Sequence, residues 1–235
     1  MKRILFSLFF AISCITCAQT PLEKPLRFVS GEDVMYLSQG NDNLVLRIMG
    51  INPFIAPETP TLAEEELETY RALCQSDSAM TNRTSEELAK LLLVTGDARY
   101  AAALDSVKQS WVPLLDVDSV RHEAARHLLN SLSWTAAVDE RGVYLNLFDD
   151  CMVNVHTDSV RFALDQINEV DRMKYRVSGL AQGRTPIVIR LRMPSPIPEK
   201  IYLNGRALLA PRIENGYLVL DRQWRNNEEI YYDLP

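Results

Sequence analysis

Cysteine is the most reactive side chain in this sequence, and it occurs four times. Cys14 and Cys17 lie in an apolar N-terminal stretch, so only Cys74 and Cys151 belong to the part that we expect to fold. Neither has a second Cys or a His nearby at the spacing of metal ligands. We interpret Cys74 and Cys151 as buried free thiols; a disulfide between them is the alternative if the protein is exported.

The three histidines and one acidic pair are the other candidates for chemistry. His122 and His127 are five residues apart on a predicted helix and so do not share a face, as zinc ligands at positions i and i+4 would. We expect His122 to be exposed and His156, on an alternating strand, to face solvent. Asp149 and Asp150 end a predicted strand and could form a catalytic pair or bind calcium; a turn is the preferred interpretation.

Two further groups have a structural interpretation beside a functional one. Glu64, Glu65 and Glu66 occupy the first turn of a predicted helix, where the helix dipole favours acidic residues, so we expect a solvated face. Six aromatic residues could build a stacking platform for sugars, although most are expected in the core or at its rim: Trp111, Trp134, Trp224, Tyr217, Tyr231 and Tyr232. The sequence therefore predicts no catalytic, cofactor-binding or metal-binding residue.

Apolar residues recur at helical spacing from Thr61 to about Trp134. Start and stop signals divide this region into four helices: a capping box of Thr61 with Glu64, a cap at Thr84 or Ser85, a stop at Gly96, a cap at Asp97, and a last helix from about Ser119. Short turns join them, which is the pattern of αα-hairpins.

The period then changes from 3.6 to 2, most clearly in residues 187–193. Asn204-Gly205 and Asn215-Gly216 predict two-residue hairpin turns, because both residue types tolerate a positive φ. About seven short strands with regularly spaced turns indicate an antiparallel β-sandwich. We therefore predict an α+β fold in which a short α-hairpin segment precedes the sandwich, and the inner helix faces bury against each other or the sheet.

The predicted organisation has four parts: a signal peptide at 1–18, an extended lead-in at 19–60 with one strand at 43–49, a helical segment at 61–137 and the β-sandwich at 138–235. The net charge of −6 and the lack of a Lys/Arg run argue against nucleic acid as a partner. We attribute the acidity to solubility.

The N-terminal residues predict export. Lys2 and Arg3 precede an almost wholly apolar stretch at 4–12, the pattern of a secretory signal peptide. Two outcomes are open: ordinary cleavage before Gln19, or a lipoprotein with a lipidated Cys14 or Cys17. No later stretch is long and apolar enough to span a membrane.

Three stretches together resemble a known family. They are a helix-turn-helix at 91–104 with a Thr-Gly-Asp turn, a helix and strand at 125–132 and 142–147, and strand motifs at 189–195, 201–205, 215–220, 223–224 and 233–235. Their order and spacing resemble the last toroid helices and the middle β-domain of β-L-arabinofuranosidases of glycoside hydrolase family 127 (GH127). The resemblance covers about residues 75–235.

The resemblance implies a retaining hydrolase that acts on terminal β-L-arabinofuranose with a cysteine nucleophile. A zinc ion holds that cysteine as a thiolate, with further Cys and a Glu as ligands. This chain departs from the family there. An ungapped comparison places Ser119 and Val120 at the paired cysteines, and Asp77-Ser78-Ala79 at a Glu-Thr-Cys ligand motif. The chain also has room for only part of the toroid.

The sequence therefore predicts an exported, glycosidase-derived protein without catalytic activity, cofactor or zinc. The alternatives are a carbohydrate-binding module, which requires exposed aromatic residues on one sheet face, a hydrolase completed by a partner glycosidase chain, which requires a large apolar surface, and a remnant with no selected role. We also expect Leu191→Ala to destabilise more than Leu92→Ala, because the helices have lost packing partners of the toroid.

Overall fold

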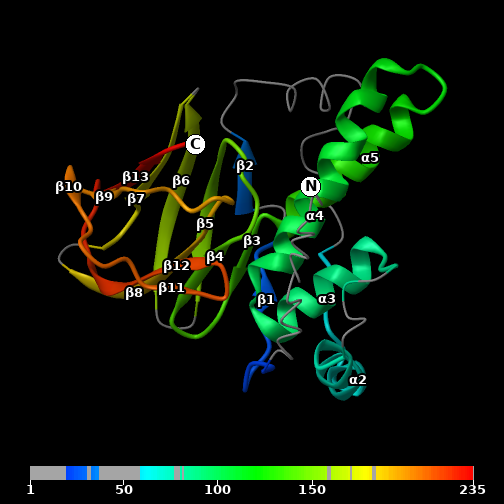
Figure 1. The fold of residues 1–235 in the computed structure, drawn as a ribbon, viewed down its shortest axis with the longest axis horizontal. Coiled ribbons are helices and arrows are strands. Elements are labelled where there is room, and N and C mark those ends of the chain that lie inside the picture. The colour runs from blue at the N-terminus through cyan, green and yellow to red at the C-terminus, as the bar shows by residue number, and fades with distance from the viewer. Residues whose placement is uncertain are drawn as a thin grey trace, which may run out of the picture.

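The computed structural model describes residues 20–30, 33–36, 59–76, 80, 82–157, 160–169, 171–181 and 184–234. Within these ranges the chain forms three layers, with helices on one side and two β-sheets beyond them (Figure 1). The predicted signal peptide, the predicted strand at 43–49 and the segment at 77–79 lie outside the described residues. None of the described helices is both long and apolar enough to cross a membrane.

The helical layer contains the four helices that the sequence predicts. They are α2 (Glu64–Cys74), α3 (Ser85–Thr95), α4 (Ala98–Trp111) and α5 (Arg121–Ser131), and 3-10 turns follow α4 and α5 at η2 (Val112–Asp116) and η3 (Leu132–Trp134).

Local capping chemistry sets the ends of these helices. Thr84 caps α3: its hydroxyl accepts from the Glu87 N–H at 3.2 Å, and the Glu87 carboxylate accepts from the Thr84 N–H at 2.9 Å. Gly96 ends α3 with φ +59°, and the Asp97 carboxylate accepts from the Arg99 N–H at 2.8 Å to cap α4.

The predicted cap at Thr61 is wrong. Helix α2 begins at Glu64, and the carboxylate of Glu66 accepts from the N–H of Ala63 at 3.2 Å. A carboxylate in the first turn can reach back to a backbone N–H whatever the side chain of the capping residue, so the Thr/Glu spacing misled the prediction.

The strands form two sheets. The first has the order β1-β3-β4-β8-β12-β11 and the second β10-β9-β13-β7-β6-β5-β2. Their bounds are β1 Arg27–Phe28, β2 Val34–Tyr36, β3 Ala136–Val138, β4 Gly142–Leu145, β5 Cys151–His156, β6 Arg161–Glu169, β7 Arg172–Ser178, β8 Thr185–Arg192, β9 Ile201–Leu203, β10 Arg206–Ala207, β11 Ile213–Glu214, β12 Tyr217–Trp224 and β13 Glu229–Asp233. Strands β1 and β2 come from the predicted lead-in and pair with β3 and β5.

The sandwich is confirmed, with one exception to its antiparallel pairing. Strands β4 and β8 are parallel, with Gly142 opposite Val188. A Cβ on Gly142 would lie 1.8 Å from the carbonyl oxygen of Val188, so only glycine fits at this position. Both predicted hairpin turns are present: Asn204 and Gly205 have φ of +51° and +77°, and Asn215 and Gly216 have φ of +48° and +79°.

The first core lies between the two sheets. Val143, Leu145 and Leu191 from the first sheet face Leu164 and Tyr232 from the second, and each of these is at most 1% exposed. Alternation along the strands supplies these inward residues, as the period of two predicts.

A second core lies between the helices and the outer face of the first sheet. Leu92 and Leu104 are fully buried there, beside Tyr144 and Tyr217 from β4 and β12. Every residue of α3 from Leu88 to Thr95 is buried. The reason for expecting Leu92→Ala to be milder is therefore wrong, because Leu92 is fully buried in a core to which the first sheet contributes Tyr144 and Tyr217.

Candidate functional site

The positions aligned with the family's paired cysteines lie between η2 and α5, at the end of the helical layer that projects from the body (Figure 1). Ser119 is exposed, and an ion pair of 2.7 Å between Arg121 and Asp118 spans the turn. The Arg121 guanidinium also donates to the carbonyl of Leu115 at 2.7 Å. A serine hydroxyl and the side chain of Val120 do not fit zinc, whose protein ligands are thiolate, imidazole and carboxylate.

The two thiols of the folded part lie in separate cores. Cys74 is the last residue of α2 and is 2% exposed in the core between the helices and the first sheet. Cys151 is fully buried in the core between the two sheets. Neither forms a disulfide, which confirms the preferred interpretation. Burial raises the pKa of the Cys74 thiol, whereas a nucleophilic cysteine needs a lowered pKa.

The histidines do not converge. His122 and His156 are exposed, as predicted. The ring of His127 stacks on Trp111 with centroids 4.0 Å apart, and its Nε2 lies 3.9 Å from the Glu123 carboxylate. Within the described ranges, no three or more His, Cys, Asp or Glu residues lie together in a group that could hold a metal ion.

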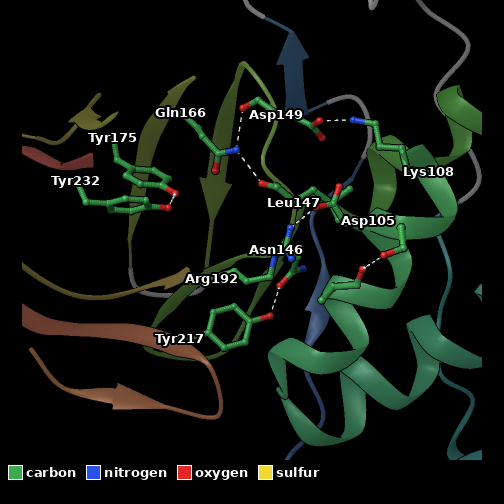
Figure 2. A network of polar contacts seen from close by, with 12 residues as sticks. Asp105, Lys108, Asn146, Leu147, Asp149, Gln166, Tyr175, Arg192, Tyr217 and Tyr232 are labelled. Carbon is green, nitrogen blue, oxygen red and sulfur yellow. Dashed lines mark hydrogen bonds and ion pairs between the residues drawn. The ribbon is translucent and has the colours of Figure 1, made fainter. Parts of the chain in front are cut away.

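A buried polar network joins α4 to the sandwich, as Figure 2 shows. The Lys108 ammonium pairs with Asp149 in the loop after β4, and both side chains are 5% exposed. One turn earlier on α4, Asp105 pairs with Arg192 at the end of β8, whose guanidinium lies 3.9 Å from the centroid of the Phe148 ring. Two ion pairs of opposite polarity therefore cross the interface of helices and sheets.

Neutral hydrogen bonds complete this network. The side-chain amide of Gln166 donates to the carbonyls of Leu147 and Asp149, both at 2.7 Å. The Tyr217 hydroxyl donates to the Asn146 side-chain oxygen at 2.8 Å (Figure 2). The Asn146 amide donates to the Trp134 carbonyl at 3.0 Å. These bonds fix residues 146–149, so the network is suited to hold the layers in register.

Asp149 and Asp150 thus lie in a loop, as predicted, but the buried pair with Lys108 was missed. A signal was available: Lys108 continues the inward face of α4 that begins with Ala101 and Leu104. Asp150 has a structural role, since its carboxylate accepts from the backbone N–H of Asn168.

Most of the aromatic candidates are core residues, as expected. Trp134, Trp224, Tyr217 and Tyr232 are buried. Tyr231 is half-buried on the outer face of the second sheet, where it stacks on Tyr202 of β9 with centroids 4.9 Å apart. The guanidinium of Arg172 lies 4.7 Å from the Tyr231 centroid. Rings stacked on each other at the strand spacing stand upright from the sheet and present edges rather than faces to a ligand.

Part of this chain is similar to a known protein family. Residues 142–235 match the family model described as "Beta-L-arabinofuranosidase, GH127 middle domain". A GH127 β-L-arabinofuranosidase from Geobacillus stearothermophilus T6 is similar over 75% of this chain and 32% of its own, with 15% identity and a TM-score of 0.51. A GH127 β-arabinofuranosidase (16% identity, TM-score 0.50) and a glycoside hydrolase (14% identity, TM-score 0.52) each match over 63% of this chain and 30% of theirs. No curated protein matches significantly.

The part of the β-sandwich at residues 142–235 is therefore similar to a domain of glycoside hydrolases. More closely, the chain is related to GH127, and residues 142–235 correspond to the GH127 middle domain. The structural similarity covers more of the chain than those residues supply, so it extends into the helical part. The chain spans about a third of the length of the solved structures that it matches.

Proposed function

We propose that this protein is an exported, GH127-derived protein that does not hydrolyse glycosides. The location of its two thiols carries the proposal. GH127 chemistry, as the resemblance implies it, requires a thiolate that reaches the sugar, whereas Cys74 and Cys151 lie in two different apolar cores. The hydroxyl of Ser119 stands where the family's cysteine is expected and is a far weaker nucleophile at neutral pH.

The outer surface of the helices supports a self-contained protein over a hydrolase completed by a partner chain. An incomplete toroid would leave a large apolar surface where further helices pack. Among the described residues, the exposed large hydrophobic side chains are Met80, Val117, Ile197 and Leu209, and none of them lies within a helix. The exposed positions of α4 and α5 carry polar residues such as Arg99, Gln109, Glu123 and Arg126.

Binding and titration measurements test the proposal. Purified protein should contain no tightly held zinc by elemental analysis. A thiol reagent should label neither Cys74 nor Cys151 in the folded protein and both after denaturation. About one zinc per chain, or a rapidly labelled thiol with the low pKa of a nucleophile, would contradict the proposal.

Export is proposed from the sequence pattern of residues 2–12, a basic start followed by an apolar stretch. Mass spectrometry of the protein isolated from its native cells should find the chain beginning at Gln19, or at a lipidated Cys14 or Cys17. Protein that retains residues 1–18 in the cytoplasmic fraction would contradict export.

A second candidate is a non-catalytic carbohydrate-binding protein. A groove between α2 and α3 favours it, because that groove combines an aromatic ring with charged and hydroxyl side chains. The stacked Tyr202 and Tyr231 on the second sheet are the competing location.

A further inference from the structure

The two Asn-Gly turns of the sandwich share one backbone conformation. Asn204 and Gly205 have φ of +51° and +77°, and Asn215 and Gly216 have φ of +48° and +79°, so both turns are type I′. Both asparagines are exposed. The turns are therefore a matched pair, and a difference in their reactivity comes from the groups that contact them.

The carboxamide of Asn204 is held at both of its polar atoms. Its oxygen accepts from the backbone N–H of Glu229 at 2.8 Å, and its NH2 group donates to the Glu228 carboxylate at 2.9 Å. Glu228 is itself fixed, since it also accepts from the backbone N–H of Arg225 at 2.8 Å. By contrast, no hydrogen bond within the described part of the chain involves the side chain of Asn215. Asn215 is therefore the asparagine whose carboxamide can turn.

Helix α4 holds the backbone of the second turn instead. The N–H of Ala98, the first residue of α4, donates to the carbonyl of Asn215 at 2.8 Å, and this carbonyl belongs to the central peptide of the turn. A flip of the central peptide converts type I′ into type II′ and changes ψ of the first central residue from about +30° to about −120°. The flip carries the carbonyl away from Ala98, so it occurs only when α4 lifts from the turn.

The flipped turn has the geometry for an intramolecular reaction. It brings the backbone nitrogen of Gly216 to the same side as the Asn215 side chain, and glycine has no side chain to obstruct the approach. The nitrogen bonds to Cγ of Asn215, the Cγ–Nδ2 bond breaks, and the amide proton passes through water to the departing ammonia. Water then opens the five-membered imide at one of its two carbonyls and leaves aspartate or isoaspartate. Water is the only co-reactant.

We propose that Asn215 is a site of spontaneous deamidation and that the docking of α4 on the turn controls its rate. Ring closure is slow compared with local opening, so the rate follows the fraction of molecules in which α4 has lifted. Isoaspartate lengthens the main chain of the turn by one methylene group and displaces the carbonyl that Ala98 binds. The modification therefore weakens the contact between helices and sandwich irreversibly, whether or not the protein hydrolyses glycosides.

Peptide mapping by mass spectrometry tests this inference on the folded mature protein, incubated at mildly alkaline pH. The exchange of NH2 for OH is followed separately at Asn215 and Asn204. We expect faster conversion at Asn215, because its reaction requires the loss of one hydrogen bond and that of Asn204 the loss of two. Ala98→Pro removes the N–H donor at a helix position that tolerates proline. It should accelerate conversion at Asn215 about threefold or more, as the loss of one net hydrogen bond does, and leave Asn204 unchanged.

Ser85→Pro is the matched control, because Ser85 is the first residue of α3 and its substitution leaves the bond between Ala98 and Asn215 in place. Circular dichroism melts establish that each variant folds, and Asn204 separates local opening from general unfolding. The inference is overturned if Asn204 is converted as fast as Asn215, or if Ala98→Pro leaves the rate at Asn215 unchanged. It is also overturned if Ala98→Pro accelerates both sites equally, or if Ser85→Pro accelerates Asn215 as much.

Discussion

The backbone N–H of Ala98 donates a 2.8 Å hydrogen bond to the carbonyl of Asn215. This bond joins the first turn of α4 to the Asn215-Gly216 hairpin turn, so two motifs that are more than a hundred residues apart meet at one point. A Cβ on Gly216 would lie 2.6 Å from the Cβ of Ala98, which shows how closely the helix sits on the turn. The helices are therefore built onto the sandwich and are not a remnant beside it.

Gly216→Ala tests this junction. Gly216 and Gly205 have nearly equal φ of +79° and +77°, so alanine at either position carries the left-handed strain of about 1–2 kcal/mol. Only the alanine at 216 also collides with Ala98, since nothing lies within 4 Å of a Cβ at 205. We expect Gly216→Ala to cost about 1–3 kcal/mol more than Gly205→Ala in urea unfolding. Equal costs would mean that the helix does not rest on the turn.

The two cores should be equally sensitive to cavities. Leu92 and Leu191 are both fully buried, so truncation of either to alanine should lower the free energy of unfolding by about 2–5 kcal/mol. Leu209→Ala is the control, because Leu209 is fully exposed and its truncation should change little. Denaturant melts give all three values. A Leu92→Ala variant as stable as Leu209→Ala would show that the helical layer lacks a core of its own.

Loss of one partner from the buried ion pair should be costly. Lys108→Met leaves the Asp149 carboxylate buried without its ammonium, and we expect a loss of about 3–5 kcal/mol. The exposed pair of Lys24 and Glu140 provides the contrast, since surface pairs contribute little and Lys24→Met should scarcely alter stability. The double variant Lys108→Met/Asp149→Leu should recover part of the loss. If Lys108→Met behaves like Lys24→Met, the network does not hold the layers.

Buried tyrosines predict a loss of stability in alkali. Burial raises the pKa of Tyr100 and of Tyr232 from 10.0 to about 12. A raised pKa means that the unfolded chain releases the proton first, so this stabilisation is complete below pH 10 and is lost as the pH rises through 12. Spectrophotometric titration should find phenols that ionise only as the protein unfolds. Titration of every tyrosine near pH 10 in the folded protein would contradict this burial.

Local chemistry explains what the sequence predicted correctly. Gly96, Asp97 and the two Asn-Gly turns act through their own backbone angles and side chains, and the inward residues of β8 follow from strict alternation. Short strands such as β1 have too few residues to show a period. The parallel pairing of β4 with β8 and the pair of Lys108 with Asp149 depend on chain segments that meet only in the folded protein.

The features of the candidate site that depend on local sequence were also predicted, and those that depend on contacts between distant segments were not. The burial of Cys74 and Cys151 was predicted from the lack of ligand spacing around them, because a missing pattern is visible in the sequence. The groove was not predicted. Tyr70 belongs to α2 and Arg83 precedes α3, and their proximity depends on how α2 packs against α3.

Turnover is the most direct test of the central claim, that a GH127-derived fold persists here without GH127 chemistry. An aryl β-L-arabinofuranoside is incubated with purified protein, with and without added zinc, beside the Cys74→Ala and Cys151→Ala variants. We predict no release of the aryl group above the rate in buffer for any of the three proteins. Zinc-dependent release that either cysteine substitution abolishes would contradict the account.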